Sequence, residues 1–286
     1  MTVWNWIFRT GLAIALLGFV WTIWPAPGER AYGNYRRGHP LYHHGPRVSI
    51  DLGHFNDAPA DARFLALADL LVWDGYRVTR SKQYLVPEYL KDTDVLVIGN
   101  ALPYPAGLRR LAGMVGLDAH ATFASEEVDA VREWVRGGGS LLLEAGVPGS
   151  GRAAAPLAAA LGLRFHDCLE PVFVAEPETE KHTILDGRSD YDEQVLRAAV
   201  LANGWIEAAS PDAPLVALLK APAARIDSCA AGKPIAVAAE FGRGRVVAFT
   251  AQMERDEDLL SRLDIDPRQS NDNVHFVLNA MHWLSR

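Results

Sequence analysis

Three polar side chains lie close together after a strand-like run early in the sequence. Residues 48–57 read VSIDLGHFND, which places Asp51, His54 and Asn56 within six positions of one another. A carboxylate that accepts a hydrogen bond from an imidazole can orient that ring as a general base for a water nucleophile. The same groups can also hold a polar ligand, so the segment predicts either a hydrolytic site or a binding site.

Two later strand-like runs also end in polar side chains. Asn100 follows the apolar run at 93–99, and Glu144, a candidate second acid or base, ends the run SLLLE. The loop GVPGSG comes next, and its Gly149 and Ser150 could offer backbone N–H groups to an anion. The loop has neither the Walker Lys-Ser/Thr pair nor G-x-G-x-x-G or G-x-S-x-G spacing. It therefore predicts neither a nucleotide site nor a serine nucleophile of the usual kind.

Each of these residues also has a structural interpretation. Asp51 can accept hydrogen bonds from loop amides, His54 can fill space and bond a carbonyl, and Asn56 can cap the following helix. Glu144 can pair with an arginine. The grouping at three strand ends is a stronger argument for a site than any single member.

Strands and helices are expected to alternate through the first part of the globular chain. Apolar side chains recur at helical spacing in three segments, while four short runs are apolar enough to be strands. This alternation is typical of a parallel sheet with helices on both faces. The predicted strands cover 47–51, 76–79, 93–100 and 140–144, and the predicted helices cover 60–75, 125–139, which Ser125 would cap, and 152–163.

After about residue 166 the pattern changes to strands with little helix between them. The motif EFGRGRV predicts a hairpin, because its two glycines supply the backbone conformations of a tight turn. The fold class is therefore α/β, a flavodoxin-like open and mainly parallel sheet with an antiparallel C-terminal extension. Predicted strands here cover 214–221, 233–241 and 244–251, and a final helix covers 271–286.

The expected fold brings the polar strand ends together. In an open parallel sheet, ligands bind beyond the carboxyl ends of the strands, near the point where the strand order reverses. We therefore predict one cleft that contains the catalytic candidates Asp51, His54 and Glu144. The full set of predicted binding residues is Asp51, His54, Asn56, Asn100, Glu144, Gly149 and Ser150.

Residues 1–27 predict a transmembrane anchor. From Gly11 to Trp24 the sequence carries no charged side chain, and the apolar stretch extends past Arg9 toward the start. Its length approaches the roughly 17–25 residues that span a bilayer as a helix. Tryptophans at both ends are typical of interfacial belts, and two prolines after Trp24 end the helix. A cleaved signal peptide is the alternative, because the charge-free run also fits a signal core.

Residues 28–46 predict a linker, since they mix Gly, Pro, Arg and aromatic residues without an apolar period. His39, His43 and His44 could bind a metal or remain solvated. The arginines of this segment could rest on anionic lipid headgroups.

The orientation in the membrane is contested within the sequence. Arg9 precedes the span and three arginines follow it, so a positive-inside count places the domain at 47–286 in the cytoplasm. A short tail before a single span is also how exported domains begin. We predict a single-pass protein of the bacterial inner membrane with an extracytoplasmic domain.

Composition narrows the classes of partner. The 286 residues are 49% hydrophobic and 22% charged with a net charge of −7, and no long basic run occurs, which disfavours nucleic acid. Cys168 and Cys229 form no CxxC motif, so neither a zinc site nor any other metal or cofactor is expected. The two cysteines could be free thiols or, in an oxidising compartment, one disulfide.

Several stretches along the globular chain carry a resemblance to a known superfamily. They are IDLGHFN, ADLLVWDGYRVT, DVLVIGN, SEEVDAVREWVRGGGSLLLEAG, KHTILDG, AEFGRGRVVAFTAQ and DNVHFVLNAMHWL. From Arg47 onward the chain resembles the class I glutamine amidotransferase-like superfamily, in its non-amidotransferase branch. That branch includes trehalose-utilisation-type domains, domains of gliding-type ABC systems and membrane-anchored bacterial proteins of unknown function.

The departure from this superfamily bears on function. Its amidotransferases place a cysteine nucleophile just after the strand that corresponds to SLLLEAG, where this chain has Glu144, Ala145 and Gly146. Alanine or glycine cannot replace a thiolate in acyl transfer, so glutamine hydrolysis is not expected. His182, in the stretch KHTILDG, is expected to have a structural role.

The sequence therefore predicts a membrane-tethered, non-catalytic domain of the cell envelope that binds a small ligand or joins a protein complex. A hydrolase that uses Asp51, His54 and Glu144 with a water nucleophile is one alternative. A carbohydrate-binding module, in which Tyr104 and Trp205 stack on sugar rings, is the other.

Overall fold

The computed structural model describes residues 40–56, 64–105, 108, 122–178, 181–191, 193–210, 214–223, 229–251 and 272–286. The predicted anchor at 1–27, and the predicted linker up to residue 39, lie outside these residues. Among the helices of the described part, none is both long and apolar enough to cross a bilayer.

One nine-stranded sheet runs through the molecule in the order β2-β1-β3-β4-β9-β8-β7-β5-β6. The five strands from β2 to β9 pair in parallel, which gives the flavodoxin-like order expected for this part. Their chain order reverses between β1 and β3, so the site is expected beyond the carboxyl ends of these two strands. These strands are β1 (Arg47–Asp51), β2 (Arg77–Ser81), β3 (Val95–Gly99), β4 (Ser140–Glu144) and β9 (Gly244–Phe249).

The remaining strands form an antiparallel extension. The predicted hairpin is confirmed, because β8 pairs with β9 in antiparallel register around Gly242, whose φ of 63° suits glycine. The extension curls, so that β6 touches the end of β9 through an isolated bridge between Ala202 and Ala251. Its strands are β5 (Leu163–Pro177), β6 (Ala198–Ala208), β7 (Val216–Lys220) and β8 (Pro234–Phe241).

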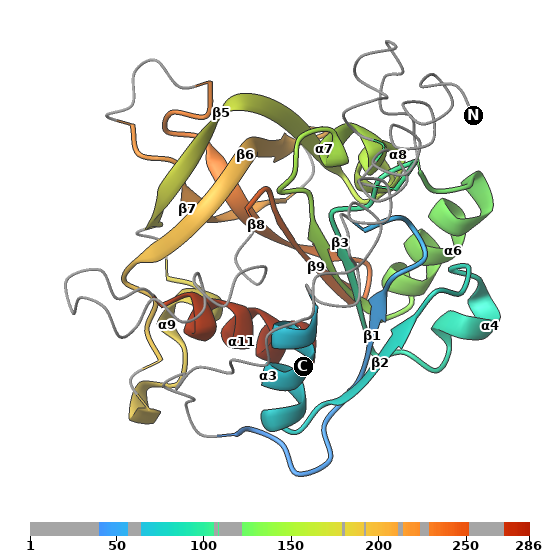
Figure 1. Ribbon diagram of the computed structural model, residues 1–286. Helices are drawn as coiled ribbons and strands as arrows, with labels where there is room; N and C mark the ends of the chain where they lie inside the picture. Colours follow the sequence, from blue (N-terminus) through green and yellow to red (C-terminus); the bar gives the residue numbers. More distant parts are fainter. Residues whose placement is uncertain are drawn as a thin grey trace, which may run out of the picture.

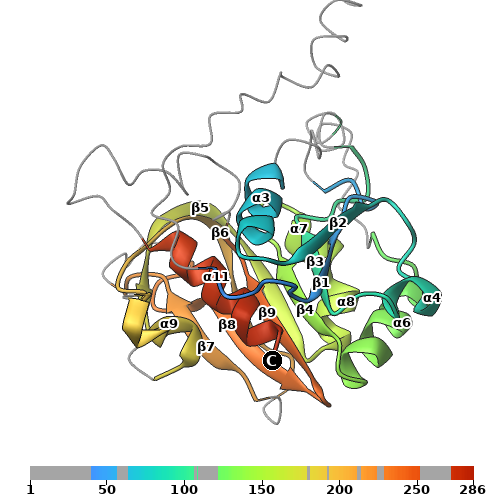
Figure 2. The same cartoon turned by 90° about the horizontal axis from the view of Figure 1, so that it is seen from below.

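Helices cover both faces of the sheet (Figures 1 and 2). The strand β3 is buried along its whole length, and its alternate residues face two different cores. On one face it packs with α3 (Leu65–Trp73) and α11 (Asn273–Leu284), and on the other with α6 (Ser125–Arg136) and α8 (Ala155–Ala160). The shorter helices are α4 (Pro87–Leu90), α7 (Ser150–Ala153) and α9 (Thr183–Asp186).

Three details differ from the sequence prediction. The helix predicted at 152–163 is two short helices, α7 and α8, because Pro156 at the start of α8 cannot donate a backbone hydrogen bond to α7. Ala124, and not Ser125, is the N-cap of α6. The strands β5 and β6 were not predicted at all.

Candidate functional site

A cavity of about 410 Å³ opens at the carboxyl ends of the parallel strands. It lies beyond β1, β2 and β3 and beside the N-terminus of α6, at the reversal of strand order where such folds bind ligands. The lining residues are Gly53, His54, Phe55, Lys82, Gln83, Tyr84, Pro103, Thr122, Ala124 and Glu127.

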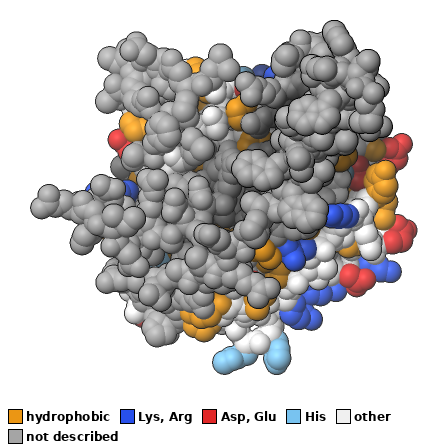
Figure 3. Space-filling view, in the orientation of Figure 1, with side chains coloured by type: hydrophobic (Ala, Val, Ile, Leu, Met, Phe, Trp, Pro, Cys, Tyr) orange, Lys and Arg blue, Asp and Glu red, His pale blue; other side chains and the backbone are white. Residues whose placement is uncertain are grey.

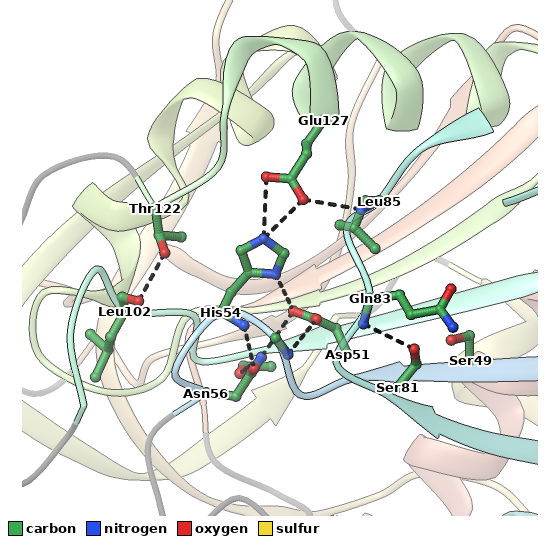
Figure 4. Close-up of polar contacts among 12 residues, drawn as sticks. Ser49, Asp51, His54, Asn56, Ser81, Gln83, Leu85, Leu102, Thr122 and Glu127 are labelled. Atoms are coloured by element: carbon green, nitrogen blue, oxygen red, sulfur yellow. Dashed lines mark hydrogen bonds and ion pairs between the residues drawn. The ribbon is translucent and has the colours of Figure 1, made fainter. Parts of the chain in front are cut away.

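The loop after β1 folds back on Asp51, the last residue of the strand. One carboxylate oxygen, Oδ1, accepts the backbone N–H of Gly53 at 2.9 Å. The other, Oδ2, lies 2.8 Å from His54 Nδ1 and accepts Asn56 Nδ2 at 3.3 Å (Figure 4). The short spacing read in the sequence therefore does bring these three side chains into one network.

Glu127, from the first turn of α6, completes this network. His54 Nε2 lies 3.2 Å from Glu127 Oε1 and 3.3 Å from Oε2. The same carboxylate accepts the backbone N–H of Leu85 at 3.0 Å and that of Ala124 at 3.1 Å. Glu127 thus ties the loop after β1, the segment after β2 and the start of α6 together (Figure 4).

The two carboxylates favour the imidazolium form of His54. Only the protonated ring can donate from both nitrogens, and a carboxylate can only accept. Burial alone would lower the pKa of His54, but its hydrogen bond to Asp51 and the charges of Asp51 and Glu127 outweigh burial and raise that pKa. A ring nitrogen that carries a proton and donates it to a carboxylate cannot abstract another proton. This arrangement therefore positions the side chains of Asp51, His54 and Glu127 and does not present a general base.

Asn56 connects this network to the neighbouring strand. Its side-chain amide donates to the carbonyl of Gly99, the last residue of β3, at 2.9 Å, and its oxygen accepts the backbone N–H of His54 at 3.3 Å. Asn56 is fully buried. The amide therefore fixes the loop after β1 against β3 and does not reach into the cavity.

Asn100 and Glu144 form a second buried network at the ends of β3 and β4. Asn100 Nδ2 donates to Glu144, and Asn100 Oδ1 accepts the backbone N–H groups of Gly146 at 2.7 Å and Val147 at 2.9 Å. Asn100 has a φ of 49°, a left-handed conformation that is uncommon outside glycine. This conformation aims its side chain at the loop after β4.

The loop that carries Gly149 and Ser150 is closed to solvent at both residues. Ser150 Oγ donates to the carbonyl of Val147 at 2.6 Å, so the hydroxyl already has a hydrogen-bond acceptor inside the protein. The following helix α7 has only four residues. Neither residue lines the cavity.

The predicted residues thus separate into two groups. Asp51, His54 and Asn56 share one network, while Asn100 and Glu144 share another, and Gly99 lies between the two. Among the described residues, no hydrogen bond or ion pair joins His54 to Glu144. His54 faces Glu127 instead.

Two exposed aromatic side chains line the cavity. Phe55 is 47% exposed and has a φ of 44°, and Tyr84 is 73% exposed. A bulky residue with a positive φ is a genuine outlier in proteins, and such strain concentrates at functional sites. No sequence pattern indicates either ring, because an exposed aromatic residue in a loop has no periodicity.

The aromatic residues expected to stack on sugars lie elsewhere. The ring of His166 stacks on Trp205 with centroids 3.8 Å apart, and Lys233 Nζ lies 3.8 Å from the centroid of the same ring. Both groups are too close to share one face, so they cover opposite faces of the indole. Trp205 therefore has no open face for a sugar, and Tyr104 does not line the cavity.

The two cysteines and His182 have structural roles. Cys168, on β5, and Cys229, before β8, form a disulfide, which decides between the alternatives that the sequence left open. His182 caps α9, because its Nδ1 accepts the backbone N–H of Ile184 at 3.2 Å. Burial lowers the pKa of His182, which favours the neutral ring that such a cap needs.

Sequence reasoning missed Glu127. An acidic residue in the first turn of a helix is favoured by the helix dipole alone, and Glu126 and Glu127 both meet that preference. The sign that separates the two is position, because Glu127 is the third residue of α6 and can reach back to the cap backbone. From that position its carboxylate also meets His54.

No family model and no curated protein matches this chain. Solved structures do match. The N-terminal domain of mmIFT52 has a TM-score of 0.60 and 13% identity, covering 84% of this chain and 97% of that chain. A ThuA-like protein from Parabacteroides merdae has a TM-score of 0.54 and 10% identity, covering 84% and 90%. The cytoplasmic protein STM3548 from Salmonella typhimurium has a TM-score of 0.52 and 15% identity, covering 84% and 99%.

These likenesses concern the fold. The chain has an α/β architecture of the kind found in ThuA-like proteins, which is consistent with a glutamine amidotransferase-like fold. At identities of 10–16% they carry no information about ligand or chemistry.

Proposed function

We propose that this chain is a membrane-tethered binding domain of the bacterial cell envelope, without catalytic activity of its own. It would hold a small polar ligand, or a partner protein, at the cavity beyond β1 and β3. The observation that carries this proposal is the pair of contacts to His54, at 2.8 Å from Asp51 and 3.2 Å from Glu127. They leave the ring no nitrogen with which to act as a base.

The loop after β4, where a cysteine nucleophile would be expected, supports a non-catalytic role. We propose that the chain belongs to the non-amidotransferase branch of the class I glutamine amidotransferase-like superfamily. At the position where the amidotransferases of this superfamily have a cysteine nucleophile, this chain has Ala145 and Gly146. The N–H groups of Gly146 and Val147 are bonded to Asn100 Oδ1. Free backbone N–H groups are what an oxyanion requires, so this loop is also not arranged for acyl transfer.

The hydrolase alternative requires Asp51, His54 and Glu144 to act on one water. Glu144 is bonded to Asn100 and is buried, whereas His54 is bonded to Asp51 and Glu127. A proton transfer would need His54 to leave one of its two carboxylates. The geometry therefore favours binding over hydrolysis.

A carbohydrate ligand is the second candidate function. It is favoured by the exposed rings of Phe55 and Tyr84 beside a polar cavity with Lys82 and Gln83. Rings offer faces to sugar C–H groups, and the polar side chains offer donors to hydroxyls. This places the stacking residues at different positions from Tyr104 and Trp205.

The proposed location combines the sequence with the disulfide. The charge-free run from Gly11 to Trp24 supports an anchor in the inner membrane. The bond between Cys168 and Cys229 supports an extracytoplasmic domain, because disulfides persist in oxidising compartments. The positive-inside count is the opposing argument.

The test is a turnover assay on the full chain in detergent, with glutamine, nitrophenyl esters and nitrophenyl glycosides as substrates. We expect no turnover above that of His54→Ala. Turnover that this substitution abolishes would overturn the non-catalytic proposal.

Binding is tested separately with a panel of amino acids, short peptides and oligosaccharides observed by ligand NMR. A ligand of the cavity should bind roughly tenfold more weakly to Tyr84→Ala, which loses one contact of about 1.4 kcal/mol. Leu196→Ala is the matched control, because Leu196 is 70% exposed and lies away from the cavity. Equal weakening by both variants would argue against this site.

A further inference from the structure

The end of the predicted linker is fixed to the edge of the sheet opposite the candidate site. The backbone N–H of Leu41 donates to Asp74 Oδ1 at 2.8 Å, and that of Tyr42 donates to the Asp74 carbonyl at 3.1 Å. Gly45 donates to the carbonyl of Gly75 at 2.8 Å. These acceptors form the C-terminal end of α3. The first described residues of the chain, 40–45, therefore lie at this edge of the domain.

A cavity of about 710 Å³ opens at the same edge, where β1, β2, β3 and β4 begin. Four basic side chains and one carboxylate line it, although the whole chain has a net charge of −7. Figure 3 shows Lys and Arg side chains on the lower right of the molecule, with Asp and Glu side chains among them and His side chains at the lower border. The charged lining residues are Arg47, Arg77, Lys91, Arg286 and Asp94.

Some arginines near this edge serve the fold. Arg245 donates to the carbonyl of Trp283 at 2.8 Å, and Arg243 donates to that of Gly137 at 2.7 Å, so both satisfy carbonyls at helix ends. Arg47 pairs with Asp94 at 2.9 Å and with Asp92 at 3.3 Å. These three cations are therefore largely committed to groups of the protein.

Arg77 and Lys91 differ from these three. Both side chains belong to exposed residues, and Arg77 Nε donates to the carbonyl of Gly45 at 3.0 Å. A guanidinium has five N–H donors, so that bond leaves most of its hydrogen-bonding capacity for other groups. Arg77 also begins β2, the edge strand of the sheet. These two cations lie where a flat anionic surface could reach them.

Aromatic side chains accompany the charges. Tyr42 and Trp134 line this cavity and are partly buried. Tyrosine and tryptophan prefer the level of lipid headgroups, where the ring is apolar and its polar atom stays hydrated. Basic and aromatic groups together are typical of a surface that meets a bilayer.

We infer that this edge of the domain, lined by Arg77, Lys91, Tyr42 and Trp134, rests on anionic phospholipid headgroups. The inference rests on the membrane tether of the proposed function, which delivers the edge to the bilayer. The candidate ligand cavity at the opposite edge then faces away from the membrane. The charge contact with the lipid and the tether would together fix the orientation of the domain.

The experiment uses the full chain in nanodiscs of phosphatidylcholine alone and in discs that also contain phosphatidylglycerol. Hydrogen exchange is measured in peptides that cover 77–91 and 134–139. We expect slower exchange there only in the anionic discs, reversed by high salt, with no change around the cavity residues at 53–55. Equal exchange in both discs, or protection around 53–55 instead, would overturn the inference and leave the tether intact.

Two charge reversals sharpen the test. Lys91→Glu changes an exposed side chain, and Arg77→Glu adds a second site in case one variant folds poorly. Each should abolish the lipid-dependent protection. Arg164→Glu, at an exposed position on β5, is the matched control and should leave the protection unchanged.

If the proposed membrane tether is wrong, the chain will not insert into either kind of disc, and this result is seen separately. The same chain would then be sedimented with vesicles of the two compositions. Binding to phosphatidylglycerol vesicles alone, weakened roughly fivefold by each charge reversal, would keep the inference while the tether fails. No binding to either vesicle would overturn both.

Discussion

The two halves of the sheet are held together by different kinds of interaction. In the parallel half, polar side chains at the strand ends join neighbouring elements, as His54 does between Asp51 and Glu127. In the antiparallel half, a disulfide from Cys168 and the stacked ring of Trp205 accompany ion pairs such as that of His166 with Glu207. Parallel strands bring their carboxyl ends to one edge, whereas hairpins send alternate ends to opposite edges. A polar site therefore assembles more readily in the parallel half.

The largest expected effect is on the parallel half, from His54→Ala. Removal of the imidazolium leaves the carboxylates of Asp51 and Glu127 buried and facing each other. Breaking a buried ion pair in this way costs about 3–5 kcal/mol of unfolding free energy. Urea denaturation of the full chain measures it.

His282→Ala is the matched comparison for that variant. His282 is buried and pairs with one carboxylate, since its Nε2 lies 2.6 Å from Asp74. Its removal takes the partner from Asp74 Oδ2 only, while Oδ1 keeps the N–H of Leu41, and we expect a smaller loss of about 1–3 kcal/mol. A larger loss for His282→Ala would show that the network at the cavity is not the stronger of the two.

The antiparallel half is tested by the double substitution of Cys168 and Cys229 with alanine. The disulfide closes a loop with a sequence separation of 61 residues. Its loss should reduce the unfolding free energy by about 2–4 kcal/mol. Hydrogen exchange should accelerate in β6 and β7 more than in β1 and β3, and uniform acceleration would contradict a tie that is local to this half.

The third prediction concerns the pH dependence of the unfolding free energy, which the titration of His54 in the parallel half should control. Because the folded-state pKa of His54 lies above its ordinary value of 6.5, the stabilisation it gives is complete below about pH 6.5. That stabilisation is lost as the pH rises through the raised folded-state pKa, with a slope of at most about 1.4 kcal/mol per pH unit.

Unfolding free energies between pH 6 and 9 measure this loss. The control is His54→Gln, which has no titrating ring and should lack this component of the slope. Parallel curves for the two proteins would contradict the assignment of the slope to His54.

The smallest effect is expected from Lys233→Ala in the antiparallel half. The ammonium over Trp205 is partly exposed, and such a cation–π contact contributes about 0.5–1 kcal/mol. Thermal unfolding of the variant, with Lys181→Ala as an exposed control, measures it. A loss well above this range would indicate a further role for Lys233.

The sequence predicts the parallel half well. Its strands are short apolar runs, and every residue of β3 and β4 is buried, so composition alone identifies them. The helix α6 is equally clear, because Val128, Val131 and Val135 recur at helical spacing and are buried.

The antiparallel half is harder to predict. The sequence indicates β7 and β8, but β5 and β6 have no regular alternation. Register shifts interrupt their pairing after Asp167 and again after Val172. Such irregularities break the period of two on which strand prediction depends.

The candidate site is predictable only where it is local. Asp51, His54 and Asn56 lie within six consecutive residues, so their closeness in space can be read from the sequence. Glu127 comes from a helix 73 residues beyond His54, and only the packing of α6 beside β3 reveals the contact. Glu144, the expected partner of His54 in the cleft, is hydrogen-bonded to Asn100, a contact that no local spacing in the sequence indicates.

The hydrogen bonds from residues 41–45 to the end of α3 also have a mechanical consequence. A pull from the residue 40 side, as the proposed tether would exert, would first load the contacts at Asp74 and Gly75, and would reach β1 only after those contacts break. Because β1 is paired on both sides, the force would then act along the strand and shear many ladder bonds at once. Under the proposed tether, the domain would therefore be pulled at a point where several hydrogen bonds share the load.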